Sequence, residues 1–132
     1  MVEVVRTDVI RKYPFPEIEN ERFCTEALIW NRIALKYKMR FFYEKIYVCS
    51  YLPDGLTAHM RHVRMNSPVY ATMFYKELMT APVPVLQKLK AAINYWRFKF
   101  CDNTNVVPPL SFRWLWLIPI SLLMHLNDLR YK

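Results

Sequence analysis

The spacing of hydrophobic and polar residues along the chain predicts a mixture of strands and helices. Residues 2–7 (VEVVRT) alternate and are rich in β-branched side chains, which is typical of a short strand. The aromatic and β-branched stretch 39–52 predicts a second strand, ended by the turn residues Pro-Asp-Gly. Apolar residues recur at helical spacing in three further segments, at 25–40, 68–80 and 83–101. Together these patterns favour an α/β fold that is rich in helix.

Two of the predicted helices have recognisable starts. Thr25 is a candidate N-cap for the first, and cations near 36–40 suit the C-terminal end of its dipole. Ser67 or Asn66 is a candidate N-cap for the helix over 68–80. The segments between these predicted elements are polar or contain proline and are expected to be loops: 12–21, 56–68 and 102–110.

The C-terminal segment 112–132 is strongly hydrophobic. From Trp114 to Leu126 only a proline, a serine and a histidine interrupt the apolar residues. This run is shorter than the roughly 20 apolar residues needed to span a bilayer. Trp114 and Trp116 near one end, and Arg130 and Lys132 near the other, are residue types typical of a membrane–water interface. We therefore expect a hydrophobic C-terminal helix, with a membrane surface as one candidate partner.

Composition limits the functions that this chain can have. Its 132 residues are the length of one domain, and 54% of them are hydrophobic, which is enough for a core. The net charge of +8 permits an anionic partner without selecting one. Gly55 is the only glycine, which excludes both glycine-rich phosphate-binding motifs. No known nucleic-acid-binding motif occurs, so we expect no nucleic-acid partner.

The residues that usually bind metals are dispersed in this sequence. Cys24, Cys49 and Cys101 form no Cys-x-x-Cys pair, so neither a zinc site nor a disulfide framework is expected, and reduced thiols fit a cytosolic protein. No Asp-x-Asp or Asp-Asp pair occurs. Such pairs hold Mg²⁺ or Mn²⁺ against a diphosphate. We therefore predict no metal and no cofactor bound by this chain alone.

Glu26 is the most informative carboxylate. It directly follows the predicted N-cap, where the helix dipole favours its ionised form. A carboxylate held ionised beside a hydroxyl group can act as a general base. Acidic residues in a first helical turn also commonly serve only to stabilise the helix, and position alone favours that second interpretation.

A basic cluster follows the second predicted strand. The stretch 54–64 contains His59, Arg61, His62 and Arg64. Such a cluster can bind a diphosphate leaving group through charge-assisted hydrogen bonds. A solvated basic loop is the simpler interpretation, and the two histidines lack a third ligand at zinc-site spacing.

The order of these residues resembles the C-terminal half of a family 2 glycosyltransferase, the GT-A-type enzymes of capsule, exopolysaccharide and lipopolysaccharide synthesis. The likeness runs from about residue 2 to residue 100. It lies in an ordered series: Phe15-Pro16-Glu17, then Glu21, Phe23 and Glu26, then Trp30, an aromatic strand, Tyr51-x-x-Asp54-Gly55-Leu56-Thr57, Asn66-x-Pro68, and finally Tyr75 with Glu77.

The resemblance implies a fold and an activity. Residues 1–101 would be the acceptor-side portion of a GT-A nucleotide-diphospho-sugar transferase, with a few strands and about four helices, followed by a linker at 102–111 and the hydrophobic tail 112–132. Such an enzyme transfers a sugar from a nucleotide-diphospho-sugar to a glycan or lipid-linked acceptor. Glu26 matches the position of the general base. The implied substrate-binding residues are Trp30, Asp54, His59, Arg61 and Arg64.

The chain departs from the family because the half with the nucleotide-binding strands and the Asp-x-Asp has no counterpart here. Divalent metal, Mg²⁺ or Mn²⁺, is expected only together with that half, so we expect this chain to be incomplete and inactive by itself. Its expected location is cytoplasmic, including the inner face of the plasma membrane. The alternative is a non-enzymatic, basic protein that binds a membrane surface or a partner through 83–101 and 112–132. Sequence leaves the donor sugar, acceptor, linkage and oligomeric state open.

Overall fold

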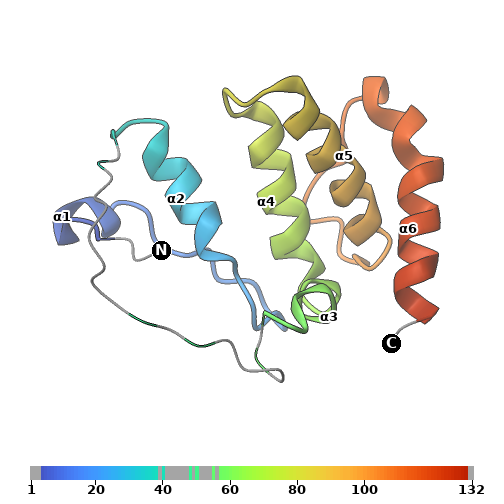
Figure 1. Ribbon diagram of the computed structural model, residues 1–132, viewed down its shortest axis with the longest axis horizontal. Helices are drawn as coiled ribbons and strands as arrows, with labels where there is room; N and C mark the ends of the chain where they lie inside the picture. The colour runs from blue at the N-terminus through green and yellow to red at the C-terminus, as the bar shows by residue number, and fades with distance from the viewer. Residues whose placement is uncertain are drawn as a thin grey trace.

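The computed structural model of the protein describes residues 4–38, 40, 48, 50, 55 and 57–130, and all regular structure in these residues is helical. The elements are α1 (Thr7–Ile10), α2 (Glu26–Ala34), α3 (Met60–Met65), α4 (Pro68–Thr80), α5 (Val85–Lys99), the 3₁₀-helix η1 (Phe112–Leu117) and α6 (Ile118–Arg130). Helices α4, α5 and α6 stand side by side, and α2 lies on the opposite side of α4 from α5 (Figure 1).

The main core lies between α4, α5 and the η1–α6 segment and is unusually aromatic. Tyr75 of α4 stacks on Phe98 of α5 with ring centroids 5.9 Å apart, and Phe74 meets Tyr75 edge to face at 5.0 Å. Tyr95 of α5 is fully buried, and its hydroxyl donates to the carbonyl of Pro108 at 3.1 Å. Aromatic pairs of this kind contribute about 0.5–1.5 kcal/mol each beyond the area they bury, which helps to fix α5 on α4.

The segment between α5 and η1, expected from composition to be a linker, packs onto this core. Val107 and Leu110 are buried members of it. Asp102 accepts hydrogen bonds from the Thr104 N–H at 2.8 Å and from Lys99 Nζ at 2.8 Å. Burial alone would raise the pKa of Asp102, but the hydrogen bonds from Lys99 and Thr104 outweigh it and hold the pKa below its ordinary value.

A second, smaller core joins α1 to α2. It consists of Val9 from α1 with Ile29 and Ile33 from α2, and Trp30 packs against them. An ion pair connects α2 to α4: the Arg32 guanidinium donates to both carboxylate oxygens of Glu77, at 2.9 and 2.6 Å. A two-pronged arginine–carboxylate pair fixes orientation as well as distance, so it sets how α2 lies against α4.

The expected α/β fold, the C-terminal portion of a GT-A domain, is contradicted, because the described residues form helices and no strand. Residues 4–6 of the first predicted strand have no regular structure, and Thr7 begins α1. Arg6 instead pairs with Asp8 at 3.0 Å, in the first turn of that helix. A strand needs a neighbouring strand to satisfy its backbone, and the described residues provide none. The second predicted strand, 39–52, lies almost entirely outside the described residues.

Other local predictions are confirmed with small changes. Helix α4 begins after Ser67 as expected, and α5 lies within the predicted 83–101. Helix α2 begins after Thr25 but ends at Ala34, earlier than the 36–40 boundary that was expected. The basic stretch 56–68 was expected to be a loop, and this was wrong over α3, whose Met65 is buried in the main core.

Candidate functional site

The acidic segment before α2 is attached to the N-terminus of α4. The carboxylate of Glu21 accepts hydrogen bonds from the backbone N–H groups of Val69, at 2.6 Å, and Tyr70, at 2.8 Å. Those N–H groups are unpaired within their helix, because the first turn has no preceding carbonyl groups. The Ser67 side chain at the N-cap does not bond to them. Glu21 therefore caps α4 from a distance of almost fifty residues along the chain.

More hydrogen bonds join the same two segments. The Tyr70 hydroxyl donates to the carbonyl of Pro16 at 2.6 Å and accepts from the Ile18 N–H at 3.1 Å. The Phe23 N–H donates to Ser67 Oγ at 3.2 Å. Burial raises the pKa of Glu21, although the two backbone N–H groups act in the opposite direction. These contacts fix the path of the chain up to the start of α2.

Glu26 lies at that start with its side chain exposed. The N-cap residue Thr25 makes no side-chain capping bond, so the positive end of α2 is left open beside Glu26. Leu28 is buried on the opposite side of the helix, and Glu26 faces outward. Glu26 makes no hydrogen bond or ion pair with another residue that the structure describes. Its carboxylate is therefore available to a ligand.

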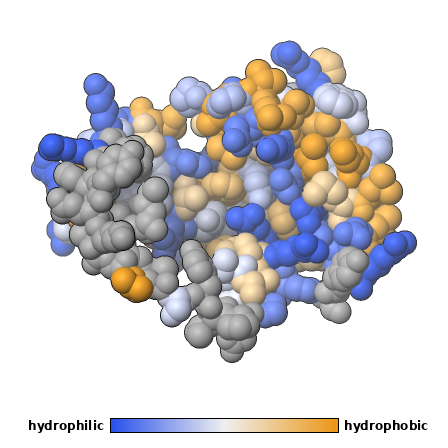
Figure 2. Space-filling model, in the orientation of Figure 1, coloured by the Kyte–Doolittle hydropathy of each residue, from blue (hydrophilic) through white to orange (hydrophobic). Residues whose placement is uncertain are grey.

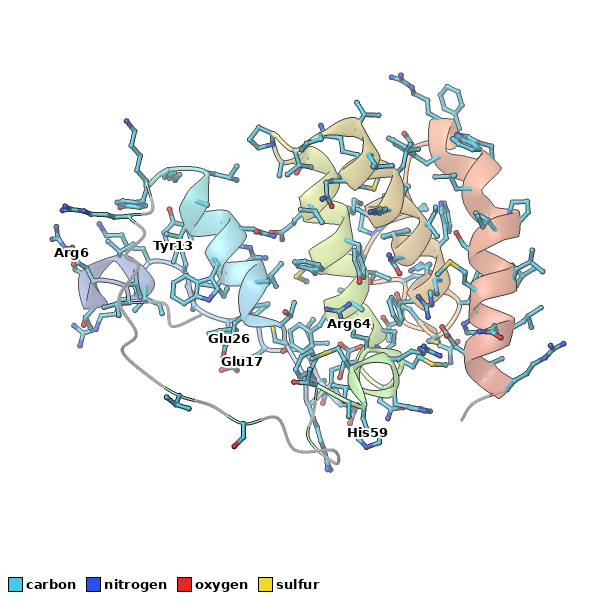
Figure 3. All side chains as sticks on the ribbon, in the orientation of Figure 1. Arg6, Tyr13, Glu17, Glu26, His59 and Arg64 are labelled. Atoms are coloured by element: carbon cyan, nitrogen blue, oxygen red, sulfur yellow. The ribbon has the colours of Figure 1, made fainter. Side chains whose placement is uncertain are left out.

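Two other residues can be placed relative to this helix end. Figure 3 shows Glu17 and Glu26 at the same end of α2 in the view, both directed downward. Trp30 follows Glu26 by four residues, so the two side chains lie on the same side of α2, one turn apart. Trp30 is half-buried against the small core, and its buried Nε1–H has no hydrogen-bond acceptor among the described residues.

The basic residues expected to act together point to two different places. His59 and Arg61 line an open groove of about 700 Å³ formed by residues 57–62 and Asn127. Arg61 Nε lies 3.5 Å from the carboxylate of Asp128. His59 is labelled at the lower edge of the molecule in Figure 3, below Arg64. Asp54 lies outside the described residues.

Arg64 instead faces the acidic segment. It donates to the Tyr75 hydroxyl at 2.6 Å and lies 5.7 Å from the centre of that ring. Together with Phe23, Thr25 and Ser67 it lines a small hollow. The structure thus brings Arg64 close to the residue that precedes Glu26, and it assigns His59 and Arg61 to a separate groove.

Sequence reasoning missed the residues that build this site. The role of Glu21 as the cap of α4 was not predicted, and the sequence did not connect Ser67 or Tyr70 with the acidic segment. The sequence signal for this site was Ser67-Pro68. Proline at the first helical position marks a helix start, whose backbone N–H groups need an acceptor. Nothing in the local sequence says which distant carboxylate pairs with them.

Comparisons with known protein families, with curated proteins and with solved structures find no match to this chain. Within the described ranges, no cluster of three histidine, cysteine or acidic residues is arranged to hold a metal ion. The helices that the structure describes are also too short or too polar to cross a membrane. The groups that the structure places at or beside α2 are the Glu26 carboxylate, the Trp30 indole and the Arg64 guanidinium, which lines a hollow with Thr25.

Proposed function

We propose that this chain provides the acceptor side of a glycosyl transfer, with Glu26 as the general base. The observation that carries the proposal is the exposed Glu26 carboxylate, which has no partner among the described residues although the segment before it is held in place. The Glu21 bonds to Val69 and Tyr70 provide that fixation. A general base must be held within hydrogen-bond reach of its substrate. This role therefore requires that the segment preceding α2 be fixed in position.

The residues of the ordered series that resembles glycosyltransferases also contact one another. Glu21 caps the helix that begins at Pro68, and Phe23 bonds to Ser67, which stands between Asn66 and Pro68. These contacts support the proposal because they explain why Glu21 and Phe23 precede the Asn66-x-Pro68 stretch in the ordered series: they hold the start of α4. The proposal does not require a sheet in the described residues, since Glu26 and its supports lie on α2, α4 and the segment before α2.

The proposed step is a displacement at the anomeric carbon of a nucleotide-diphospho-sugar. Glu26 accepts the proton of an acceptor hydroxyl group, and that oxygen forms a bond to the anomeric carbon. The bond from this carbon to the diphosphate breaks, and its electron pair leaves with the diphosphate. Trp30, one turn from Glu26, is the candidate surface for the apolar side of an acceptor sugar. Donor and divalent metal are assigned to a polypeptide segment other than the described one.

The proposal is tested first on the chain itself. Saturation-transfer NMR with a panel of glycans measures acceptor binding, and the indole N–H signal of Trp30 reports whether the sugar lies beside α2. We expect Trp30→Ala to abolish binding and Glu26→Gln to retain it. Glycan binding that Trp30→Ala does not change would contradict the assignment of the acceptor surface.

The base is tested in a chain joined to a donor-binding segment that restores transfer. We expect Glu26→Gln to lower kcat at least about 100-fold, the lower end of general-base contributions, with donor affinity unchanged. Glu19→Gln is the matched control, since Glu19 is an exposed glutamate of the same acidic segment. A Glu26→Gln variant that keeps kcat within about tenfold of the wild type, or roughly 1.4 kcal/mol in barrier, would rule out the base assignment.

A further inference from the structure

Helix α6 buries two polar residues against the protein and exposes all four of its leucines to solvent. Ser121 and Asp128 are its buried residues, at 0% and 1% exposure. His125 is half-buried and lies 5.4 Å from the ring of Phe100. A helix at the surface of a globular protein normally has the opposite arrangement. The orientation of α6 therefore needs a specific cause.

The cause is an ion pair with α5. Arg97 donates to both carboxylate oxygens of Asp128, at 2.5 and 2.6 Å, and Arg61 of the α3 segment lies 3.5 Å from the same carboxylate. The buried Ser121 hydroxyl donates a hydrogen bond to the Leu117 carbonyl at 2.8 Å. A buried carboxylate must keep its partner, because an unpaired buried charge is very costly. Holding Asp128 inside turns the leucines of α6 outward.

The result is a set of exposed apolar side chains along η1 and α6, which we call the α6 outer face. Leu123 at its centre is 68% exposed and Trp116 is 67% exposed. Its members recur along η1 and α6: Phe112, Leu115, Trp116, Ile120, Leu122, Leu123, Leu126 and Leu129. Figure 2 shows hydrophobic side chains along the edge of the molecule formed by α6. Contiguous apolar surfaces of this kind usually mark interaction sites.

The length and charge of this segment favour a lipid surface as its occupant. Helix α6 has 13 residues and is therefore about 20 Å long, less than the roughly 30 Å hydrocarbon core of a bilayer. Arg113 and Arg130 are exposed near the two ends of the segment. Asp128 is the only acidic residue between 112 and 130, and it is buried and paired. The outer face consequently presents leucines, an indole and cations, which suits insertion parallel to an anionic membrane.

The same arginines make a second copy of the chain a less suitable partner for the α6 outer face. If two α6 helices paired antiparallel, Arg113 of one copy would lie near Arg130 of the other. If they paired parallel, each arginine would lie near its own equivalent. Either arrangement brings like charges together, with no exposed acid on η1 or α6 to compensate them.

We propose that the α6 outer face binds the surface of a membrane containing anionic lipids, with α6 lying in the plane of the interface. The leucines and Trp116 enter the boundary between head groups and acyl chains, and Arg113 and Arg130 contact lipid phosphates. This inference is independent of the glycosyl-transfer proposal, since it does not involve Glu26 and applies equally to a non-enzymatic protein.

The test is sedimentation of the full chain with vesicles of phosphatidylcholine alone and of phosphatidylcholine with added phosphatidylglycerol. We expect binding to the anionic vesicles that weakens as salt is added, because salt screens exposed charges. Leu123→Glu should weaken binding at least about tenfold, since it removes a leucine that would be buried in the membrane and places a charge in the interface. Replacing Arg113 and Arg130 by glutamine should weaken binding to anionic vesicles roughly fivefold each.

Leu35→Glu is the matched control, because Leu35 is also an exposed leucine but follows α2 and lies away from the α6 outer face. It should bind as the wild type does. Leu123 is exposed, so its glutamate variant should remain folded, which circular dichroism verifies. The proposal is overturned if Leu123→Glu binds like the wild type, if neutral and anionic vesicles bind equally, or if neither binds. A dimer in solution that Leu123→Glu dissociates, without vesicle binding, would assign the face to a second copy.

Discussion

Replacing Glu21 by alanine removes the acceptor for two backbone N–H groups at the start of α4. Val69 and Tyr70 are both buried, at 2% and 7% exposure, so water has little access to the N–H groups that would lose their partner. No side chain of α4 itself takes over, since the Ser67 side chain makes no capping bond. The substitution therefore removes the cap of α4 and one of the links between the acidic segment and that helix, while the bonds of Tyr70 to Pro16 and Ile18 remain.

The expected cost follows from the size of the lost interactions. Loss of an N-cap acceptor costs about 0.5–2 kcal/mol, and a hydrogen bond to a charged group contributes about 1.5–3 kcal/mol. These values describe partly the same interaction and cannot be added. Burial of the Glu21 carboxylate, which raises its pKa, offsets part of the gain. We therefore expect the free energy of unfolding to fall by about 2–3 kcal/mol.

Urea unfolding followed by circular dichroism measures this loss, and amide hydrogen exchange locates it. Exchange at Val69 and Tyr70 should accelerate in Glu21→Ala, while exchange within α5 changes only as much as the global stability does. Glu19→Ala is the control, because Glu19 is exposed in the same segment and should change stability by less than about 0.5 kcal/mol. A Glu21→Ala variant as stable as Glu19→Ala, with the same exchange at Val69, would refute the capping role.

Two further perturbations test the main helical layer. Asp128→Ala leaves Arg97 without its carboxylate partner and should lower the free energy of unfolding, measured in urea, by about 3 kcal/mol. Asn127→Ala, at an exposed neighbouring position, is the control and should lower it little. Equal losses in the two variants would contradict the importance of the ion pair. Burial raises the pKa of Tyr95 to about 12. The folded state thus holds this proton more tightly than the unfolded state, so stability is fully present below the ordinary pKa near 10 and falls as pH rises toward 12, by up to about 1.4 kcal/mol per pH unit. Tyr95→Phe should remove that part of the pH dependence between about pH 10 and pH 12, as measured by urea unfolding. If the free energy of unfolding has the same slope against pH in the variant and the wild type, Tyr95 ionises as easily in the folded protein as in the unfolded chain.

Glu26 illustrates how the candidate site divides between sequence and structure. The helix start at Thr25 and Glu26 was predictable, because a capping residue followed by apolar positions at helical spacing is a local signal. The exposure of Glu26 agrees with the burial of Leu28 on the opposite side of α2. The fixation of the preceding segment was not predictable, because Glu21 and Val69 are far apart in the chain and meet only when α4 has formed.

Sequence by itself determined where α4 and α5 form, since periodicity, Ser67 and Pro68 act within one or two helical turns. The strand predicted at 2–7 was wrong over residues 4–7, the part that the structure describes, because a strand depends on a distant neighbour that its own residues do not specify.

Only the tertiary structure decided the direction in which each helix faces. The hydrophobicity of 112–132 was evident in the sequence, but the ion pair between Asp128 and Arg97 is what turns its leucines toward solvent. The same packing separates Arg64 from His59, which the sequence places only five residues apart. In each case the decisive contact joins residues on different elements. Short-range patterns specify helices, and pairing of buried charges and backbone N–H groups specifies how the helices are oriented.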